Sequence, residues 1–377
     1  MPSFALRSWV EISLKQIAAN YNAVRNAVGP NVEVMPVVKA DGYRHGAIEI
    51  SKAVIEHGAR WLAVSNVEEG IALRDAGIQT RILVMADFLP DDRKTLLEYS
   101  LTPVIHALED IPAWDELAAS RGIKAAYHLK VDSGMGRLGT RADAATIAEV
   151  INRTPHAHVE GLMTHFASAA DYSGSQTEEQ MGYFEAIRGD LERAGIIPEY
   201  IHLSSSTPVV YGRRKSWQKM VRPGHAIYGY VSQASRGSAP PKIIDVKPAL
   251  TWRASVVSVK DIPERAAVGY GGMFHAPRPM RIAVLAAGYA DGIPHRLSNR
   301  GRVIANGCLA SIIGAVSMDL TTIDVTNCPS IRVADAVTLL GTENGITIDA
   351  QQIARTAGTI SYSVLCGIHA RVKRFYI

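Results

Sequence analysis

The sequence has few cysteines and no long apolar run. Three cysteines occur among 377 residues, at positions 308, 328 and 366, and none forms a C-x-x-C pair. An odd, sparse count is typical of a reducing compartment and argues against a disulfide-stabilised fold. No apolar run approaches the ~20 residues that a membrane-spanning helix needs. The opening MPSFALRSWVEIS also lacks a charged leader followed by a long apolar stretch. We therefore expect a cytoplasmic protein with no membrane partner, with secretion as the alternative.

Blocks of like charge, internal repeats and low-complexity tracts are also missing. The 40 Lys and Arg residues intermingle with 36 Asp and Glu residues, and the net charge is +4. Because there is no basic stripe, nucleic acid is not an expected partner. The composition, 47% hydrophobic and 20% charged, is that of an ordinary globular protein. A chain of 377 residues is too long for one ordinary core, so we expect two domains.

Short apolar strands alternate with helical patterns from residue 13 to about residue 230. The strand candidates are EVMPVVK (33–39), WLAVSN (61–66), RILVM (81–85), TPVI (102–105), YHLKV (127–131), VEGLMTH (159–165), YIHLS (200–204) and MVRPG (220–224). Eight strands that alternate with helices favour an α/β fold of the (β/α)8 TIM-barrel type over a doubly wound open sheet. We assign this domain to residues 1–235.

The pattern changes after the Pro- and Ser-rich junction VSQASRGSAPPK (231–242). β-rich runs follow, such as ALTWRASVVSVK and RIAVLAAGY, and a long helical period returns only at DAQQIARTAG (349–358). We therefore expect a mostly β domain over residues 236–377.

Polar and cationic residues recur where the predicted barrel strands end. They are Lys39, Lys130 with Arg137 in the loop beyond it, His165, the serines 204–206, and Arg222 with Gly224. Taken singly, each is an ordinary residue: a solvated loop lysine, a core histidine, a turn serine or a surface arginine. Their repeated placement at the same end of successive strands is what indicates a site, because catalytic groups of this fold gather at that end.

The chemistry of such a site starts from Lys39. A free lysine has a pKa near ~10.4 and is a poor nucleophile, but burial and cationic neighbours lower that pKa and favour a Schiff base. Loops after the seventh and eighth strands are the usual phosphate site of this fold. A helix that begins near Thr207 would add a favourable dipole for an anion. A lysine that binds a carbonyl beside a phosphate site indicates pyridoxal 5′-phosphate.

With these residues in view, the chain resembles the alanine racemases, a family of fold-type III pyridoxal-phosphate enzymes, over nearly its whole length. The resemblance rests on the order and spacing of VVKADGYRHG, HLKVDSGMGRLG, GLMTHFA, VRPGHAIYG, VGYGG, AAGYADG, VSMD and SYSVLCGIHARV. It implies a racemase that interconverts L-alanine and D-alanine, with pyridoxal 5′-phosphate as cofactor and no metal.

The resemblance also implies the two bases. Lys39 would bind the cofactor covalently and act as the base on one face of the amino-acid substrate. Tyr270 would be the base on the opposite face and would come from the partner subunit of a homodimer with shared active sites. Met318 and Asp319 would help to bind the substrate carboxylate across that dimer. Two bases on opposite faces can remove and return the α-proton without rotating the substrate.

Five residues would hold the cofactor phosphate by the same resemblance. These are Tyr43, Ser206, Tyr362 and the backbone of Gly224 and His225.

Four further residues would contact or support the cofactor ring. Arg137 would contact the phenolic oxygen of the cofactor and the substrate carboxylate, and a carbamylated Lys130 would orient Arg137. His165 would lie beneath the ring and link Arg222 to Tyr270. Arg222 would face the pyridine nitrogen. Because an arginine stays protonated, it would leave that nitrogen unprotonated and make the ring a weaker electron sink.

Several positions depart from the family pattern. Ser205 stands where Asn is usual, His225 where an aliphatic residue is usual, and Ser363 where Glu is usual. Ala315 and His295 occupy places where the substrate corridor commonly has arginines. These departures leave open whether the enzyme is strict for alanine or admits larger amino acids.

Three other functions compete with this interpretation. A basic amino-acid decarboxylase shares the scaffold but commonly has an acid at the pyridine nitrogen, where we place Arg222. A non-catalytic pyridoxal-phosphate carrier has no need of the β-rich domain that bears Tyr270. A broader racemase of serine or basic amino acids differs only in pocket shape, and one methylene changes discrimination by only ~1–3 kcal/mol.

Overall fold

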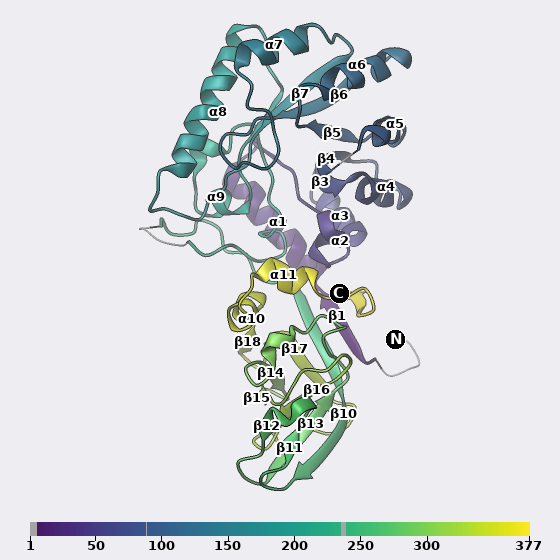
Figure 1. Cartoon of the computed structure of the whole chain (residues 1–377), viewed down its shortest axis with the longest axis vertical. Helices are drawn as coiled ribbons and strands as arrows, with labels where there is room; N and C mark the ends of the chain where they lie inside the picture. The colour runs from purple at the N-terminus through teal and green to yellow at the C-terminus, as the bar shows by residue number, and fades with distance from the viewer. Residues whose placement is uncertain (1–5, 88, 235–238) are drawn as a thin grey trace. The chain divides into compact units, whose positions relative to one another are not determined.

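The computed structural model describes residues 6–87, 89–234 and 239–377 (Figure 1). The chain forms two compact units, one of residues 15–42 and 47–247, the other of the residues up to Leu14 together with Tyr43–Gly46 and Pro248–Ile377. The predicted domain boundary at 235/236 lies outside the described residues and stays a prediction.

Parallel strands build the first unit. Six of them pair in chain order in one sheet: β3 (Trp61–Asn66), β4 (Arg81–Asp87), β5 (Thr102–Ile105), β6 (Ala125–Lys130), β7 (Ala157–Met163) and β8 (Tyr200–His202). A further parallel pair joins β2 (Glu33–Val34) to β9 (Met220–Val221).

Backbone hydrogen bonds join this pair to both edges of the six-stranded sheet. On one side Val37 forms a parallel bridge with Ala63 of β3. On the other side the Lys219 N–H donates to the Ile201 carbonyl of β8 at 3.1 Å. The eight parallel strands of the described residues therefore form a ring, which confirms the predicted TIM-type barrel and excludes the open sheet.

Helices alternate with the strands of the ring (Figure 1). They are α1 (Leu14–Val28), α3 (Ala47–Glu56), α4 (Val67–Asp75), α5 (Arg93–Glu98), α6 (Asp110–Ser120), α7 (Ala144–Asn152), α8 (Gln176–Arg193) and α9 (Ser206–Val210). Asn66 and Asp143 cap α4 and α7 by accepting backbone N–H groups of the first turn. Gly77 has φ +82° just after α4, a conformation that suits glycine at a helix end.

Antiparallel strands build the second unit. Its sheet has the order β18-β17-β14-β15-β16-β13-β10-β1-β19, and β17 also pairs with β10, so the six strands from β17 to β10 close into a barrel. The bounds are β1 (Ser8–Ile12), β10 (Leu250–Ile262), β13 (Met280–Leu285), β14 (Arg302–Ala305), β15 (Cys308–Ile312), β16 (Thr321–Asp324), β17 (Ala336–Glu343), β18 (Ile346–Ile348) and β19 (Lys373–Tyr376). Two helices, α10 (Ala350–Ala357) and α11 (Ser361–Cys366), follow β18. The predicted mostly β domain is therefore confirmed.

The N-terminal strand belongs to this second unit. β1 pairs antiparallel with β10 and parallel with β19. The sequence analysis did not predict β1.

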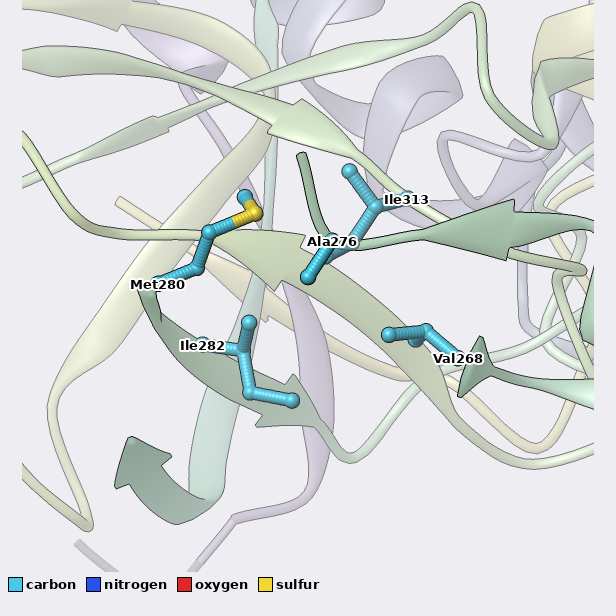
Figure 2. Close-up of a cluster of buried hydrophobic side chains, with 5 residues drawn as sticks. All are labelled: Val268, Ala276, Met280, Ile282 and Ile313. Atoms are coloured by element: carbon cyan, nitrogen blue, oxygen red, sulfur yellow. The ribbon is translucent and has the colours of Figure 1, made fainter. Parts of the chain in front are cut away.

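A separate hydrophobic cluster lies beneath the hairpin of β11 (Ala267–Val268) and β12 (Phe274–His275). Figure 2 shows its five buried side chains, which are Val268, Ala276, Met280, Ile282 and Ile313. The cluster ties the segment around residue 270 to the closed β-barrel.

Within the described residues, no helix has both the length and the apolar character that crossing a membrane requires.

Candidate active site

The backbone turns left-handed directly after Lys39. Lys39 follows the buried residues Val37 and Val38 and begins the short element α2 (Lys39–Tyr43). Positive φ values, from 52° to 64°, occur at five successive residues, 40–44. A left-handed turn costs about 1–2 kcal/mol for each residue other than glycine, so the surrounding contacts must stabilise it. The sequence analysis did not predict this left-handed turn.

Glu69 and Asp41 supply such contacts. One carboxylate oxygen of Glu69 accepts the Ala40 N–H at 2.6 Å, and the other accepts the Ser65 N–H at 2.8 Å. The Asp41 carboxylate accepts the Ala47 N–H at 2.9 Å. Glu69, which the sequence analysis missed, therefore ties the residue after Lys39 to the end of β3.

The predicted cationic residues of the barrel act on one histidine. The pKa of His165 is lowered to about 3, chiefly by burial and in addition by electrostatic repulsion from Arg222, Lys130, Arg137 and Lys39. His165 is therefore neutral at physiological pH, and all four cations lie close enough to affect its charge. Lys130 is 5% exposed, and burial followed by the repulsion of Arg137 and Arg222 lowers its pKa to about 8.

Arg222 is buried among hydrogen-bond acceptors. One of its terminal nitrogens, Nη2, donates to the Thr164 carbonyl at 2.8 Å and lies 3.3 Å from His165 Nδ1. The other, Nη1, donates to the His202 carbonyl at 2.7 Å and lies 2.9 Å from His202 Nδ1. Burial lowers the pKa of Arg222 to about 9, so the side chain still carries its charge at neutral pH. His202 was not among the predicted site residues.

The loop that carries Arg137 is closed at its base and braced from within. The Asp132 N–H donates to the Thr140 carbonyl at 2.9 Å, and the Thr140 N–H donates to the Lys130 carbonyl at 2.9 Å. Inside the loop, one carboxylate oxygen of Asp132 accepts three successive backbone N–H groups, those of residues 134–136, at 2.9 to 3.1 Å. Asp132 therefore fixes the backbone that presents Arg137.

The loops after β8 and β9 meet at Ser206. The Ser206 hydroxyl, at the start of α9, accepts the N–H groups of Gly224 and Ala226, each at 3.1 Å. Because this hydroxyl accepts both N–H groups, its own proton can be donated to an anion such as a phosphate group. Gly224 and Ser206 were predicted for this role, and Ala226 was not. The buried ring of His225 stacks on Tyr230 with ring centroids 5.3 Å apart.

The remaining predicted residues belong to the second unit. Tyr43 and Tyr362 lie together there, with ring centroids 6.0 Å apart. Tyr270 begins a one-turn 3-10 segment (Tyr270–Gly272), and its side chain is 78% exposed. Gly269, at φ +76°, precedes it, and a Cβ there would lie 3.0 Å from the Ala315 backbone nitrogen. The turn that presents Tyr270 thus packs tightly against the segment before Met318.

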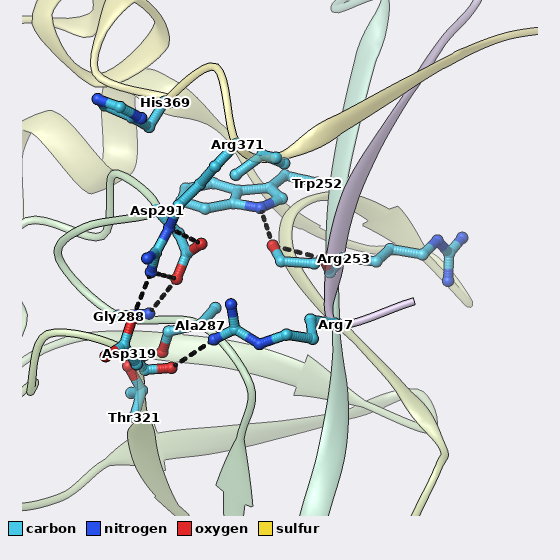
Figure 3. A network of polar contacts seen from close by, with 12 residues as sticks. Arg7, Trp252, Arg253, Ala287, Gly288, Asp291, Asp319, Thr321, His369 and Arg371 are labelled. Atoms are coloured by element: carbon cyan, nitrogen blue, oxygen red, sulfur yellow. Dashed lines mark hydrogen bonds and ion pairs between the residues drawn. The ribbon is translucent and has the colours of Figure 1, made fainter. Parts of the chain in front are cut away.

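A charged network holds the Asp319 side chain (Figure 3). Arg371 binds the buried carboxylate of Asp291 through two nitrogens, at 2.7 and 2.8 Å, and binds the Asp319 carboxylate at 2.8 Å. The Ala290 N–H donates to the Met318 carbonyl at 3.0 Å. The Asp319 side chain is therefore held by Arg371. Asp291 and Arg371 were not predicted as site residues.

Two of the departures from the family pattern lie at open cavities of the second unit. His295 lines a cavity of about 600 Å³ together with Arg296 and Arg300. Ser363 and Arg296 line a second cavity of about 370 Å³. Arginines therefore remain beside both positions. Among the described residues, no group of three or more His, Cys, Asp or Glu side chains is placed to hold a metal ion.

Comparisons with known proteins agree over both halves of the chain. The family model described as "Alanine racemase, N-terminal domain" matches residues 12–232, and "Alanine racemase, C-terminal domain" matches residues 249–376. The curated alanine racemase of Halothermothrix orenii is 40% identical over 370 residues, which cover 98% of this chain and 96% of that protein. That of Symbiobacterium thermophilum is 37% identical over 98% of this chain and 97% of its own length.

Solved structures give the same result. The alanine racemase from D-cycloserine-producing Streptomyces lavendulae superposes with a TM-score of 0.92 at 30% identity, covering 100% of this chain and 98% of that one. The alanine racemase from Bartonella henselae with covalently bound pyridoxal phosphate superposes with a TM-score of 0.88 at 26% identity, covering 98% and 99%. The two family matches and the full-length relatives together show that this chain belongs to the alanine racemase family of isomerases.

Proposed function

We propose that the chain interconverts L-alanine and D-alanine with pyridoxal 5′-phosphate, and that Lys39 and the Tyr270 of a second copy are the two bases. The observation that carries this proposal is the group of Lys39, Lys130, Arg137 and Arg222 around the neutral His165. An amine on a braced turn and a set of cations suit an anionic cofactor that carries an aldehyde and an anionic substrate.

The residues present fit this cofactor. The Ser206 hydroxyl accepts the N–H groups of Gly224 and Ala226, so it can donate its own proton to the phosphate. We assign Tyr43, Tyr362 and the backbone of Gly224 and His225 to the same phosphate on the basis of the family resemblance. When bound, pyridoxal phosphate withdraws electrons from the amino acid and makes its α-proton acidic.

The two bases work on opposite faces of the substrate. For one enantiomer Lys39 takes the α-proton and Tyr270 returns one, and for the other enantiomer the roles are exchanged. A phenol needs cationic surroundings to act as a base at neutral pH, and the cations around His165 provide them. The 78% exposure of Tyr270 is consistent with a phenol that works in a second copy.

Arg222 restrains the chemistry and Arg137 binds the substrate. Arg222 is charged and only donates hydrogen bonds, so it cannot take a proton from a group that it faces. We assign the substrate carboxylate to Arg137, with Met318 and Asp319 of the second copy contributing. The ion pair between Asp319 and Arg371 fits a role in which Asp319 is held in place rather than free to move.

We also propose that Lys130 is carbamylated. Its lowered pKa of about 8 leaves part of the amine neutral near neutral pH. A neutral amine adds to carbon dioxide, so a C–N bond forms and a proton leaves, giving an anionic carbamate. The change of sign replaces repulsion of Arg137 and Arg222 by attraction. A carbamate resonance in the ¹³C NMR spectrum under ¹³CO2, absent in Lys130→Met, tests this assignment.

Deuterium incorporation at Cα tests the two-base assignment. Wild-type holoenzyme in D2O should incorporate deuterium from both L-alanine and D-alanine. Tyr270→Phe should lose exchange from one enantiomer far more than from the other. Tyr183→Phe removes a phenol of α8, away from the predicted site residues, and should behave as wild type. Equal loss from both enantiomers in Tyr270→Phe would contradict the assignment, and carbon dioxide released from diamino acids would indicate the decarboxylase instead.

The substrate range and the assembly are the finer parts of the proposal. Ala315 and His295 reduce the positive charge expected along the substrate corridor, and Ser363 departs from the usual Glu, so a broader racemase of serine or basic amino acids is the alternative function. A scan of amino acids in which alanine alone is racemised would exclude it. A homodimer in the cytoplasm is the proposed working form. Loss of activity on dilution, in step with dissociation seen by sedimentation, would support it.

A further inference from the structure

We infer that His202 and His128 are positioning residues that hold Arg222 through two hydrogen bonds and a final electrostatic contact with Glu160 across the barrel. The inference rests on the proposed function only in that Arg222 faces the cofactor. The two histidines would act on the reaction through the orientation and charge of Arg222.

The chain of contacts is continuous from Arg222 inward. Arg222 Nη1 lies 2.9 Å from His202 Nδ1, and His202 Nε2 lies 2.8 Å from His128 Nδ1. His128 Nε2 makes no hydrogen bond, but it lies 3.5 Å from a carboxylate oxygen of Glu160, close enough for an electrostatic contact. Both histidines are fully buried, on β8 and β6 respectively.

The chain ends in an ion pair near the other end of the barrel. Arg81 is the first residue of β4, and its Nη2 donates to both carboxylate oxygens of Glu160, at 2.7 and 2.6 Å. The Arg81 guanidinium lies 3.9 Å above the ring of Trp61, the first residue of β3. Because Arg222 follows β9, a polar path leads from the carboxyl end of the strands toward the amino end.

The direction of every hydrogen bond in this path is fixed by Arg222. An arginine nitrogen only donates, so His202 Nδ1 must accept and the proton of that ring must be on Nε2. His202 Nε2 then donates to His128 Nδ1, which places the proton of His128 on its Nε2, toward Glu160. Both rings are therefore neutral. Burial, the largest cause, lowers the pKa of both histidines and agrees with this state.

The backbone makes room for the path. Tyr127 pairs with Val159 but His128 pairs with Gly161, so Glu160 is the extra residue of a bulge between β6 and β7. A bulge re-aims the side chain that it carries. A Cβ at residue 161 would lie 2.5 Å from the His128 ring, so only glycine leaves space for the imidazole there. The bulge at Glu160 and the glycine at position 161 thus both make room for the His128 ring.

Through the two histidines, the buried charge of Arg222 is connected to the carboxylate of Glu160. The groups that accept from Arg222 at 3.3 Å or less are backbone carbonyls and neutral imidazoles. Burying a charge is costly unless opposite charge and hydrogen bonds compensate. Glu160 polarises His128, and His128 polarises His202, so the nitrogen that faces Arg222 becomes a stronger acceptor. An apolar pair of the same volume would fill the barrel without giving this acceptor.

NMR of the cofactor-free protein tests the path without reference to activity. With ¹⁵N-labelled histidine, His128 and His202 should both show the Nε2–H tautomer and should stay neutral at pH ~6.5, where a free histidine titrates, because burial lowers the pKa of both. Glu160→Gln should shift the ¹⁵N resonances of both rings. A charged ring, an Nδ1–H tautomer, or a His202 resonance that ignores Glu160→Gln would overturn the inference.

Holoenzyme variants test the effect on the site. In His202→Gln the side-chain amide lies near the former Nε2 and the acceptor for Arg222 is lost, whereas His202→Asn keeps an acceptor near Nδ1. We expect His202→Gln to lower kcat roughly 10- to 100-fold with little change in KM, and His202→Asn to recover part of that loss, as for other residues that orient an active-site group. The absorption spectrum of the bound cofactor should also change in His202→Gln. His158→Gln, which removes an exposed histidine from β7, should match wild type.

The outcomes separate the inference from the proposed function. Wild-type protein that binds no pyridoxal phosphate and racemises nothing would refute the proposed function, while the tautomer measurement would still stand. If His202→Gln and Glu160→Gln both keep the kcat and the cofactor spectrum of the wild type, the two histidines serve only to fill space. That result would overturn the inference. If His202→Gln fails to fold, the kcat and the cofactor spectrum of Glu160→Gln decide whether the inference holds.

Discussion

The carboxylate of Glu69 offers a direct test of what holds the turn after Lys39. Glu69→Ala removes the acceptor of the Ala40 N–H and of the Ser65 N–H. The neighbouring Glu68→Ala is the matched control, because both glutamates lie in the first turn of α4 and both interact with its helix dipole, but Glu68 is exposed. The difference between the two variants therefore isolates the two hydrogen bonds.

The size of the effect follows from the two bonds. A hydrogen bond to a charged group contributes about 1.5–3 kcal/mol. Because the bond from Ala40 is solvent-exposed, we take the lower part of the range, about 3–4 kcal/mol for the pair. At 1.4 kcal/mol per factor of ten, the amides of Ala40 and Ser65 should exchange with solvent roughly 100- to 700-fold faster in Glu69→Ala.

Hydrogen exchange followed by mass spectrometry on a peptide that covers residue 40 measures this directly. Glu69→Gln keeps one neutral acceptor and should fall between wild type and Glu69→Ala. Loaded with cofactor, Glu69→Ala should also release it faster than Glu68→Ala, since Lys39 loses its fixed neighbour. Equal exchange rates in the Glu68 and Glu69 variants would show that the carboxylate does not stabilise the left-handed turn.

Three other perturbations give measurable outcomes. Burial would raise the pKa of Asp132, but the three backbone N–H groups outweigh it and lower that pKa. The stability that this carboxylate contributes is present above its unfolded pKa near ~3.9 and is lost as pH falls through the folded value. In urea unfolding, Asp132→Asn should therefore be less stable than wild type at pH 7, and the difference in unfolding free energy should shrink in acid. Lys130 has a lowered pKa of about 8, so the unfolded chain binds more protons between pH 8 and ~10.4. In CO2-free buffer the stability of wild type relative to Lys130→Met should rise across that window by on the order of 3 kcal/mol, and a flat difference would contradict the shift. Asp291→Asn removes one charge that holds Arg371 in place beside Asp319. It should raise KM for alanine roughly 3- to 10-fold while leaving cofactor binding intact. An unchanged KM would show that Asp291 does not support substrate binding.

The barrel was predictable because its strands carry a strong local signal. WLAVSN and RILVM are short apolar runs bounded by turn residues, and both became neighbouring parallel strands in chain order. Polar residues such as Lys39 and Lys130 at strand ends could be named for the same reason. Because all strands of a (β/α)8 barrel run in the same direction, residues that follow a strand lie at one known end of the ring.

The features that the sequence analysis did not predict depend on contacts between residues that are far apart in the sequence. Four of the five left-handed residues after Lys39 are not glycine, so local preference argues against the conformation that Glu69 stabilises. His128 and His202 lie 74 residues apart, and each looks like an ordinary strand residue. Single-sequence patterns give no indication that the two rings meet, nor that a bulge at Glu160 brings the carboxylate toward them.

The place of β1 between β10 and β19 has a consequence for biosynthesis. Its partners are Leu250–Ala254 and Lys373–Tyr376, so β1 is synthesised before the ring strands but waits for β10 and β19 before its sheet can be completed. The (β/α)8 ring, whose strands all lie between residues 33 and 221, can assemble meanwhile. A nascent chain stalled before residue 250 should therefore contain a folded ring with an unpaired apolar strand ahead of it, a species that a chaperone would recognise.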